Sequence, residues 1–349
     1  MVLSKMRTCR KRKMVGLDTV KTAGKGLIIS IRDNTMGSTR QDDDATFVRR
    51  IHHSTPALWF FRGCWIASFL IYALRRDLVQ YWVERSWEYL YSSWLFNCVY
   101  FETWWTTLIY TFNLAFARFF AEVRYFDRFK INPSAKCLET DIWRMLLEAV
   151  EYCTPLMLLD TFMVKKYKGV GIDPKIWAEK RQSIVQESRV LPRDPPQVEA
   201  IVCHIILAVL IYDAIFYVIH FLIHRNMWLY KWVHAAHHTH GVLNTRITNL
   251  LSVPERIILV LSANEALKTV SAHPLTRFLF VPVFVGLLCE NHCGYDFPWS
   301  YDKLLPKGVA GGAYLHYKHH MNGCRHYQPF LTYLDELFTG GKPKKKKAS

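Results

Sequence analysis

Histidine clusters are the residues whose types and spacing most clearly indicate chemistry in this chain. Fifteen histidines occur in 349 residues, and most of them form one H-x-x-x-H pair followed by two H-x-x-H-H boxes. On a helix, residues at i, i+3 and i+4 lie on one side, so each cluster can present several imidazoles to one point. Imidazole suits iron, zinc, copper or nickel, and a set without thiolates excludes a structural zinc ribbon. Because these are too many ligands for one ion, we expect a two-metal site formed by His220, His224, His234, His237, His238, His316, His319 and His320.

Other polar residues near the clusters are candidates for supporting roles. His292 stands apart from the boxes, and from spacing alone it fits a ligand or a core histidine equally well. Asp213 and Tyr217 precede His220 at helical intervals, which places all three on one polar stripe of an apolar helix. Carboxylates can orient imidazole N–H groups from behind the metal ligands. The candidates for that role are Asp213, Glu290 and Asp296.

The segments that carry these residues are predicted to be helices, and several of them are apolar enough to span a membrane. Half of the chain is apolar and 15% of it is aromatic, as in membrane proteins with interfacial aromatic belts. The strongest apolar run, 198–223, ends in the first histidine pair, which places that pair at the membrane surface. We see no β-strand pattern. The sequence predicts an all-α, multi-pass integral membrane helical bundle with a histidine-rich two-metal domain on its cytosolic face.

Further helices are expected on both sides of this run. Residues 57–74 can just span a bilayer if Arg62 snorkels, or else form an interfacial helix. Residues 89–120 are expected to form a membrane helix with a continuation, in which Glu102 needs a partner, and residues 142–164 an amphipathic or half-buried helix. A helix over 230–240 would carry the second box. Two more apolar helices are expected at 257–267 and at 275–288, the second with a bend or a re-entrant turn at Pro282.

The charge pattern indicates a membrane surface rather than nucleic acid. The formal net charge is +16, but lysine and arginine gather at the termini and between apolar runs, as expected of segments facing anionic lipid. Nine cysteines without a C-x-x-C motif indicate a reducing compartment rather than a disulfide framework. Cys289 and Cys293 lie near the histidine boxes, where we expect small buried thiols, and a thiolate ligand is the alternative. Lys346 and Lys347 fit a C-terminal dilysine signal for retrieval to the endoplasmic reticulum, and a generic basic tail is the alternative.

Four segments follow from these patterns. We expect a disordered polar tail at 1–55 (a transit peptide is the alternative), N-terminal membrane helices and an aqueous linker at 56–197, the metal domain at 198–340, and a basic tail at 341–349.

At the histidine boxes the sequence resembles the fatty acid hydroxylase/sterol desaturase superfamily of membrane di-iron enzymes. The resemblance runs over about 198–338, with the boxes in the family order, Tyr230 between the first two, and Leu334-Asp335-Glu336-Leu337-Phe338 near the C-terminal signature. The stretch Glu290-Asn291-His292-Cys293-Gly294-Tyr295-Asp296-Phe297-Pro298-Trp299 is most similar to cholesterol 25-hydroxylases, and its pattern is shared with C-4 methylsterol oxidases. The third box departs from the family pattern at Tyr317-Lys318, where Asp usually follows the first histidine, and His326 stands where Asn is usual.

The resemblance implies an activity and its requirements. It adds His292 as a ninth ligand, and it implies two iron ions, which zinc can replace, and O2-dependent hydroxylation of a sterol or other lipid. Electrons would come from NAD(P)H through a reductase and cytochrome b5, and basic loops would suit an acidic cytochrome. C-4 methylsterol oxidation, sterol desaturation and fatty-acyl hydroxylation are alternatives on the same scaffold. A membrane metal-binding scaffold protein without activity is the non-enzyme alternative.

Overall fold

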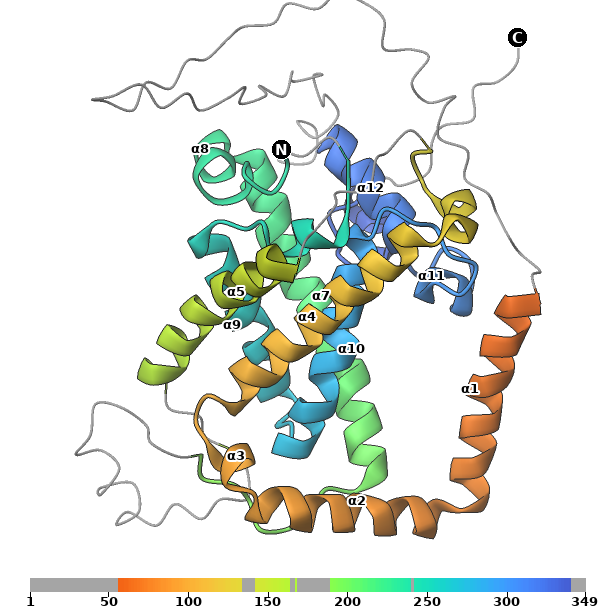
Figure 1. Cartoon of the computed structure of the whole chain (residues 1–349), viewed down its shortest axis with the longest axis vertical. Coiled ribbons are helices and arrows are strands. Elements are labelled where there is room, and N and C mark those ends of the chain that lie inside the picture. The colour runs from red at the N-terminus through yellow and green to blue at the C-terminus, as the bar shows by residue number, and fades with distance from the viewer. Residues whose placement is uncertain (1–55, 134–141, 164–166, 168–188, 240–241, 340–349) are drawn as a thin grey trace, which may run out of the picture.

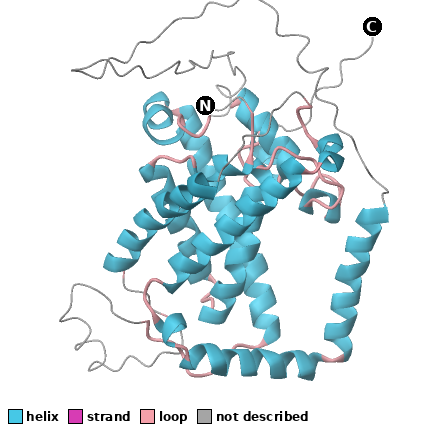
Figure 2. Cartoon of the chain, in the orientation of Figure 1, coloured by secondary structure: helices cyan, strands magenta, loops and turns pink. Residues whose placement is uncertain are grey.

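The regular elements of the chain are helical throughout the part that the structure describes. The computed structural model describes residues 56–133, 142–163, 167, 189–239 and 242–339, and the expected tails at 1–55 and 341–349 lie outside these ranges. Within them, only two isolated bridges interrupt the pattern of helices and loops, Lys130 with Tyr295 and Ala310 with Leu331 (Figure 2). The predicted all-α class is confirmed.

Three helices are long and apolar enough to cross a membrane. They are α1 (Pro56–Leu74), α7 (Val198–Arg225) and α10 (Pro274–His292). Only 6% of the apolar window of α1 is buried, against 56% for α10, so α1 exposes its side chains nearly all round. Figure 1 shows α1 at one side of the bundle. Helix α2 (Arg76–Ser92) runs along the base and connects α1 to the rest of the bundle. The membrane character predicted from these runs is confirmed.

The body of the bundle packs around α7 and α10. Helices α4 (Phe101–Glu122), α5 (Ile142–Phe162) and α9 (Val253–Thr269) complete it (Figure 1). Tyr212 of α7 is fully buried, and its ring packs edge-to-face on Phe284 of α10 with centroids 4.6 Å apart. Such aromatic contacts fix α7 and α10 side by side, and these are two of the helices that carry histidines.

Two of the expected helices are divided into shorter elements in the structure. The 89–120 segment is divided, because Ser93 caps a short α3 (Trp94–Asn97) by accepting a hydrogen bond from the Phe96 amide, and α4 starts only at Phe101. The expected helix over 230–240 is a short α8 (Met227–Leu229), a π-helical turn η4 (Tyr230–His234) and a run of turns. Helix α10 continues across Pro282 as one element, without a re-entrant break.

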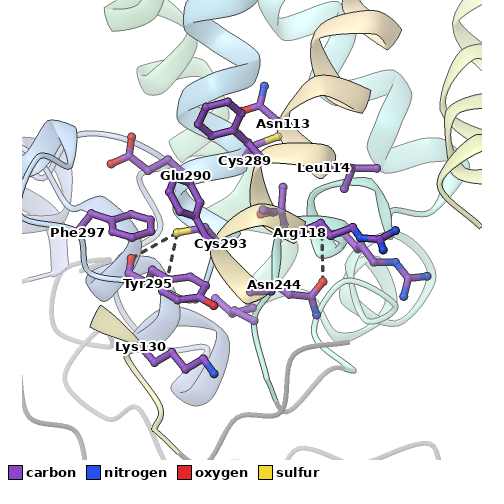
Figure 3. A pocket seen from close by; sticks show the side chains of 18 of the residues that line it. Asn113, Leu114, Arg118, Lys130, Asn244, Cys289, Glu290, Cys293, Tyr295 and Phe297 are labelled. Carbon is purple, nitrogen blue, oxygen red and sulfur yellow. Dashed lines mark hydrogen bonds between the residues drawn. The ribbon is translucent and has the colours of Figure 1, made fainter. Parts of the chain in front are cut away.

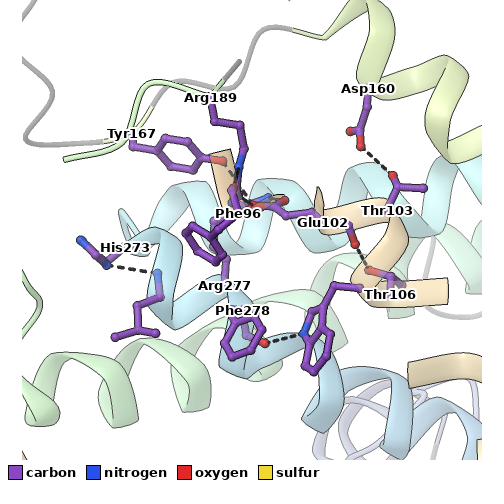
Figure 4. Close-up of polar contacts among 12 residues, drawn as sticks. Phe96, Glu102, Thr103, Thr106, Asp160, Tyr167, Arg189, His273, Arg277 and Phe278 are labelled. Carbon is purple, nitrogen blue, oxygen red and sulfur yellow. Dashed lines mark hydrogen bonds and ion pairs between the residues drawn. The ribbon is translucent and has the colours of Figure 1, made fainter. Parts of the chain in front are cut away.

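Glu102 has the partners that an acidic group in an apolar bundle requires. Arg277 donates to both of its carboxylate oxygens, from Nε at 3.0 Å and from Nη2 at 2.9 Å (Figure 4). Arg189 and Tyr167 donate to the same carboxylate at 3.1 and 3.2 Å. A buried charge is tolerated only when it is paired and hydrogen-bonded in this way, so the network ties α4 to α10.

Short elements gather at the opposite end of the bundle from α2. They are η3 (Arg124–Phe129), η5 (Thr245–Asn249), α11 (Tyr301–Leu304), α12 (Gly312–Asn322) and η6 (Asp335–Thr339). Helix α12 carries the third histidine box, and it lies at this end near the termination of α10 (Figure 1).

Candidate metal centre

All nine histidines expected as ligands come together at this end of the bundle. They form two groups, within each of which the nitrogen atoms lie within 4.8 Å of one another. The first cage comprises His220, His224, His234, His238 and His319, and the second cage comprises His237, His292, His316 and His320. Each cage is therefore built from several elements that are distant in the sequence.

Each H-x-x-H-H box is divided between the two cages. In the second box, His234 and His238 belong to the first cage, whereas His237 belongs to the second. The third box does the reverse, because His316 and His320 belong to the second cage and His319 to the first. In α12, which has 3.6 residues per turn, positions i+3 and i+4 fall on either side of position i. One box can thus supply two neighbouring metal sites.

The histidine Nε2 atoms of each cage face one another. In the first cage His234 Nε2 lies 2.9 Å from Nε2 of both His220 and His238. In the second cage His292 Nε2 lies 2.9 Å from that of His316 and 3.1 Å from that of His237. These separations place several ring nitrogens around one point in each cage.

Backbone carbonyls determine which ring nitrogen carries the proton. A carbonyl oxygen only accepts, so an Nδ1 atom bonded to one must carry the hydrogen, which leaves the lone pair on Nε2. Three histidines have such a bond at 2.7 to 2.8 Å, and the pairs are His220 with Tyr327, His292 with Leu288 and His319 with Arg325. Lone pairs that face one another repel unless a cation lies between them, so this donor set fits bound metal ions.

Burial keeps the histidines that lie outside the membrane-spanning helices in their neutral form. It lowers the pKa of His238 to about 3, and it lowers the pKa of His234 and His237 well below the usual histidine value. The pKa values of His316, His319 and His320 are lowered by the same cause. Neutral imidazoles at physiological pH can coordinate a metal without first losing a proton.

Glu255 is a functional candidate that the sequence reasoning missed. Its Oε1 atom lies 2.5 Å from His234 Nδ1, and both side chains are 3% exposed. A carboxylate in this place fixes the tautomer and raises the basicity of a metal-binding imidazole. Ser252 accepts a hydrogen bond from the Glu255 amide as the N-cap of α9. The Ser-x-x-Glu pattern was the only sequence signal, and it indicates a helix start rather than a metal site.

The carboxylates expected behind the ligands have other partners. Asp213 is fully buried and accepts hydrogen bonds from the backbone amides of Phe330 and Leu331 at 2.7 and 3.2 Å. It therefore fixes the loop that presents the Tyr327 carbonyl to His220, and it reaches the cage only indirectly. Glu290 accepts from the Tyr301 amide at 3.0 Å, Asp296 pairs with Lys303, and Tyr217 packs on Phe221 and Phe338.

The thiols near the site are not members of either cage. Cys289 is buried on α10, and Cys293 is bonded to the backbone of Tyr295. Burial raises the pKa of the Cys293 thiol, which keeps it protonated and a poor ligand. Lys346 and Lys347, expected to form a retrieval signal, lie outside the described residues.

Comparison with known proteins gives one family match and several relatives. The fatty acid hydroxylase family matches residues 205–340. The chain is 32% identical to cholesterol 25-hydroxylase of Rattus norvegicus over 148 residues, 42% of this chain and about half of that protein. It is 32% identical to cholesterol 25-hydroxylase-like protein 1, member 2, of Danio rerio (56% of this chain, 71% of the relative). It is 31% identical to a putative methylsterol monooxygenase of Dictyostelium discoideum (63% and 76%). No solved structure matches.

Proposed function

Because the chain belongs to the fatty acid hydroxylase family, we propose that it is an O2-dependent membrane hydroxylase with two iron ions that oxidises a sterol. The resemblance to the superfamily and to cholesterol 25-hydroxylases is confirmed by these relatives. The single observation that carries the proposal is the pair of adjacent imidazole cages, with five histidines in one and four in the other.

The nine histidines are proposed as the metal ligands. Iron in the two cages would supply O2 activation and the removal of hydrogen from an unactivated C–H bond. The protein holds the imidazoles neutral by burial, and it orients them through Glu255 and the backbone carbonyls of Tyr327, Leu288 and Arg325. Tyr212, Phe216, Leu259 and Leu288 line the same small cavity as the histidines, which keeps bulk water away.

The experiment compares His238→Ala with His52→Ala in cells supplied with sterol. We expect His238→Ala to abolish the oxidised sterol measured by mass spectrometry, because it removes a first-cage imidazole. His52 lies in the N-terminal tail, so its replacement should leave product unchanged. An unchanged sterol profile from iron-loaded wild-type protein would refute the sterol activity, and full turnover by His238→Ala would refute the ligand assignment.

C-4 methylsterol oxidation is a second candidate. It is supported by the relative described as a putative methylsterol monooxygenase, of which the chain covers 76%. The product separates the two reactions, because oxidation at C-4 and on the side chain gives different fragment ions. A membrane scaffold that keeps the cages for zinc would contain zinc and consume no O2.

The remaining assignments extend the proposal. We propose residence in the endoplasmic reticulum membrane with the metal centre facing the cytosol, and electron delivery from NAD(P)H by a reductase and cytochrome b5. Three apolar helices of spanning length support the membrane location. We also propose that 198–340 is the di-iron unit and 56–197 the N-terminal membrane unit.

A further inference from the structure

Polar side chains other than histidine line the small cavity that the two cages share. The cavity has a volume of about 30 Å³, and seven of the nine histidines line it. A single water molecule needs roughly 10 to 15 Å³ of such space, so the cavity has room for a molecule the size of O2 or water. The other polar side chains in its walls are those of Tyr212, Thr248, Glu255 and Asn291. These four are the groups that can contact a small molecule held beside the metals.

Two of these four side chains already have partners in the protein. Asn291 donates to the Pro329 carbonyl at 2.5 Å and accepts from the Tyr301 hydroxyl at 2.7 Å. Glu255 serves the ligand His234, because its Oε1 atom lies 2.5 Å from Nδ1 of that ring, although its second oxygen has no partner. Both side chains are therefore explained by contacts within the protein.

The hydroxyls of Tyr212 and Thr248 are different, because neither has a hydrogen-bond partner among the described residues. Tyr212 is fully buried and Thr248 is 7% exposed, so bulk water does not serve them. Tyr212 lies on α7 about two turns before His220, whereas Thr248 lies on η5, so the two approach the cavity from separate elements. A buried hydroxyl without a partner is unfavourable and needs an explanation. The cavity that both residues line is where a partner can lie.

Thr248 stands at the boundary of this cavity. The Cys289 thiol lies beside its hydroxyl, but a thiol is a weak hydrogen-bonding group and does not replace a stronger partner. Cys289 also lines a second pocket of about 840 Å³, together with Leu114 and Phe297 (Figure 3). Neither Tyr212 nor Thr248 lines that larger pocket. The two hydroxyls therefore belong to the small cavity at the metals.

We propose that Tyr212 and Thr248 are catalytic residues that donate hydrogen bonds to the small oxygen ligand of the metal centre. The proposal rests on the proposed function, because it takes the cages to be the place where O2 reacts. In the hydroxylation, one oxygen atom of O2 enters the C–H bond, and the other leaves as water after taking up two electrons and two protons. Negative charge develops on oxygen as the electrons arrive, and fixed donors in a site closed to bulk water stabilise such charge strongly.

Four substitutions separate this role from simple packing. Thr248→Val and Tyr212→Phe each remove a hydroxyl and keep the shape of the side chain. Thr276→Val and Tyr110→Phe are the matched controls, because their hydroxyls are also buried without a partner, yet neither residue lines the metal cavity. Thr248→Ser restores a hydroxyl at the same position and serves as the rescue variant.

The probe is azide, added to the oxidised, iron-loaded, full-length protein and followed by the absorption of the iron–azide complex. We expect azide to bind about tenfold more weakly to Thr248→Val and to Tyr212→Phe, because each loses a donor to the bound anion. The two controls and Thr248→Ser should keep wild-type affinity. Product formation should fall about 100-fold in the first two variants. Iron content and the midpoint of thermal unfolding, measured on every variant, show whether the cages remain intact.

Wild-type azide affinity in Thr248→Val and Tyr212→Phe would overturn the proposal, as would equal weakening in the two controls or failure of the wild type to bind azide. Because the two hydroxyls lie on separate elements, a variant that loses iron leaves the decision to the other. Weaker azide binding by the hydroxyl variants of an enzyme that oxidises no sterol would support the two donors and refute the sterol activity. Sterol oxidation by the wild type, with unchanged azide affinity in the variants, would refute the donors alone.

Discussion

Replacing Glu255 tests how the first cage is held in position. Its carboxylate lies 2.5 Å from Nδ1 of His234, and each of the two side chains is only 3% exposed. Glutamine keeps an oxygen that can accept from Nδ1–H but removes the charge. Alanine leaves that N–H buried without an acceptor.

The size of the effect follows from the role of such partners. Loss of a carboxylate behind a metal-binding imidazole weakens metal affinity by about 10- to 100-fold. That range corresponds to about 1.4 to 2.8 kcal/mol. We expect Glu255→Gln near the lower limit and Glu255→Ala near the upper, and because Glu255 contacts only a first-cage ligand, one of two iron equivalents should weaken.

The assay is competition for iron between purified protein and a chelator. Glu265→Gln is the matched control, since Glu265 lies on the same helix with its side chain 58% exposed. Thermal unfolding of the iron-free variants checks that α9 remains folded. Wild-type affinity for both equivalents in Glu255→Ala would refute the reasoning, as would equal weakening by Glu265→Gln.

Three further substitutions probe the frame around the site, each by thermal unfolding in detergent. Asp213→Asn replaces the oxygen that accepts from the Gln328 side-chain amide with a donor, and it should lower the free energy of unfolding by about 1 to 3 kcal/mol. An unchanged midpoint of thermal unfolding would contradict the role of Asp213 in holding the loop at residues 328–331. Arg277→Met leaves Glu102 with fewer partners and should lower the free energy of unfolding by about 3 kcal/mol. The additional change Glu102→Gln should restore part of this stability, and no recovery would argue against the pairing. Gly312→Ala should cost about 1 to 3 kcal/mol, because Gly312 has a φ of +63° and an added Cβ would lie 2.5 Å from Asp302; wild-type stability would show that the turn can relax.

The sequence was sufficient to predict the helices whose pattern is local. The run ending at His220 and His224 became α7, and the apolar run at 57–74 became α1, because length and hydropathy alone specify such segments. The helix expected over 230–240 was wrong. The second box lies on a π-helical turn followed by turns, whereas the third box, which has the same spacing, divides between the cages from the regular helix α12.

The partition of the ligands and their supporting contacts could not be predicted in the same way. Spacing indicated that imidazoles converge, but it did not indicate that His237 and His238, adjacent in sequence, belong to different cages. Glu255 is 21 residues from His234, and only the packing of α9 against the turn brings them together. Asp213 was placed correctly on the helix stripe, yet its acceptor oxygens are used by amides more than a hundred residues away.

The division of each histidine box between both cages has a consequence for assembly. An ion in either cage would be bound by the turn at 234–238 and by α12 together, so the first ion to bind fixes both segments for the second. Iron titration of the apoprotein should therefore show positive cooperativity, with the second ion binding more tightly than the first. Loss of the ion from one cage would in turn weaken the binding of the ion in the other cage, because both depend on the same two segments.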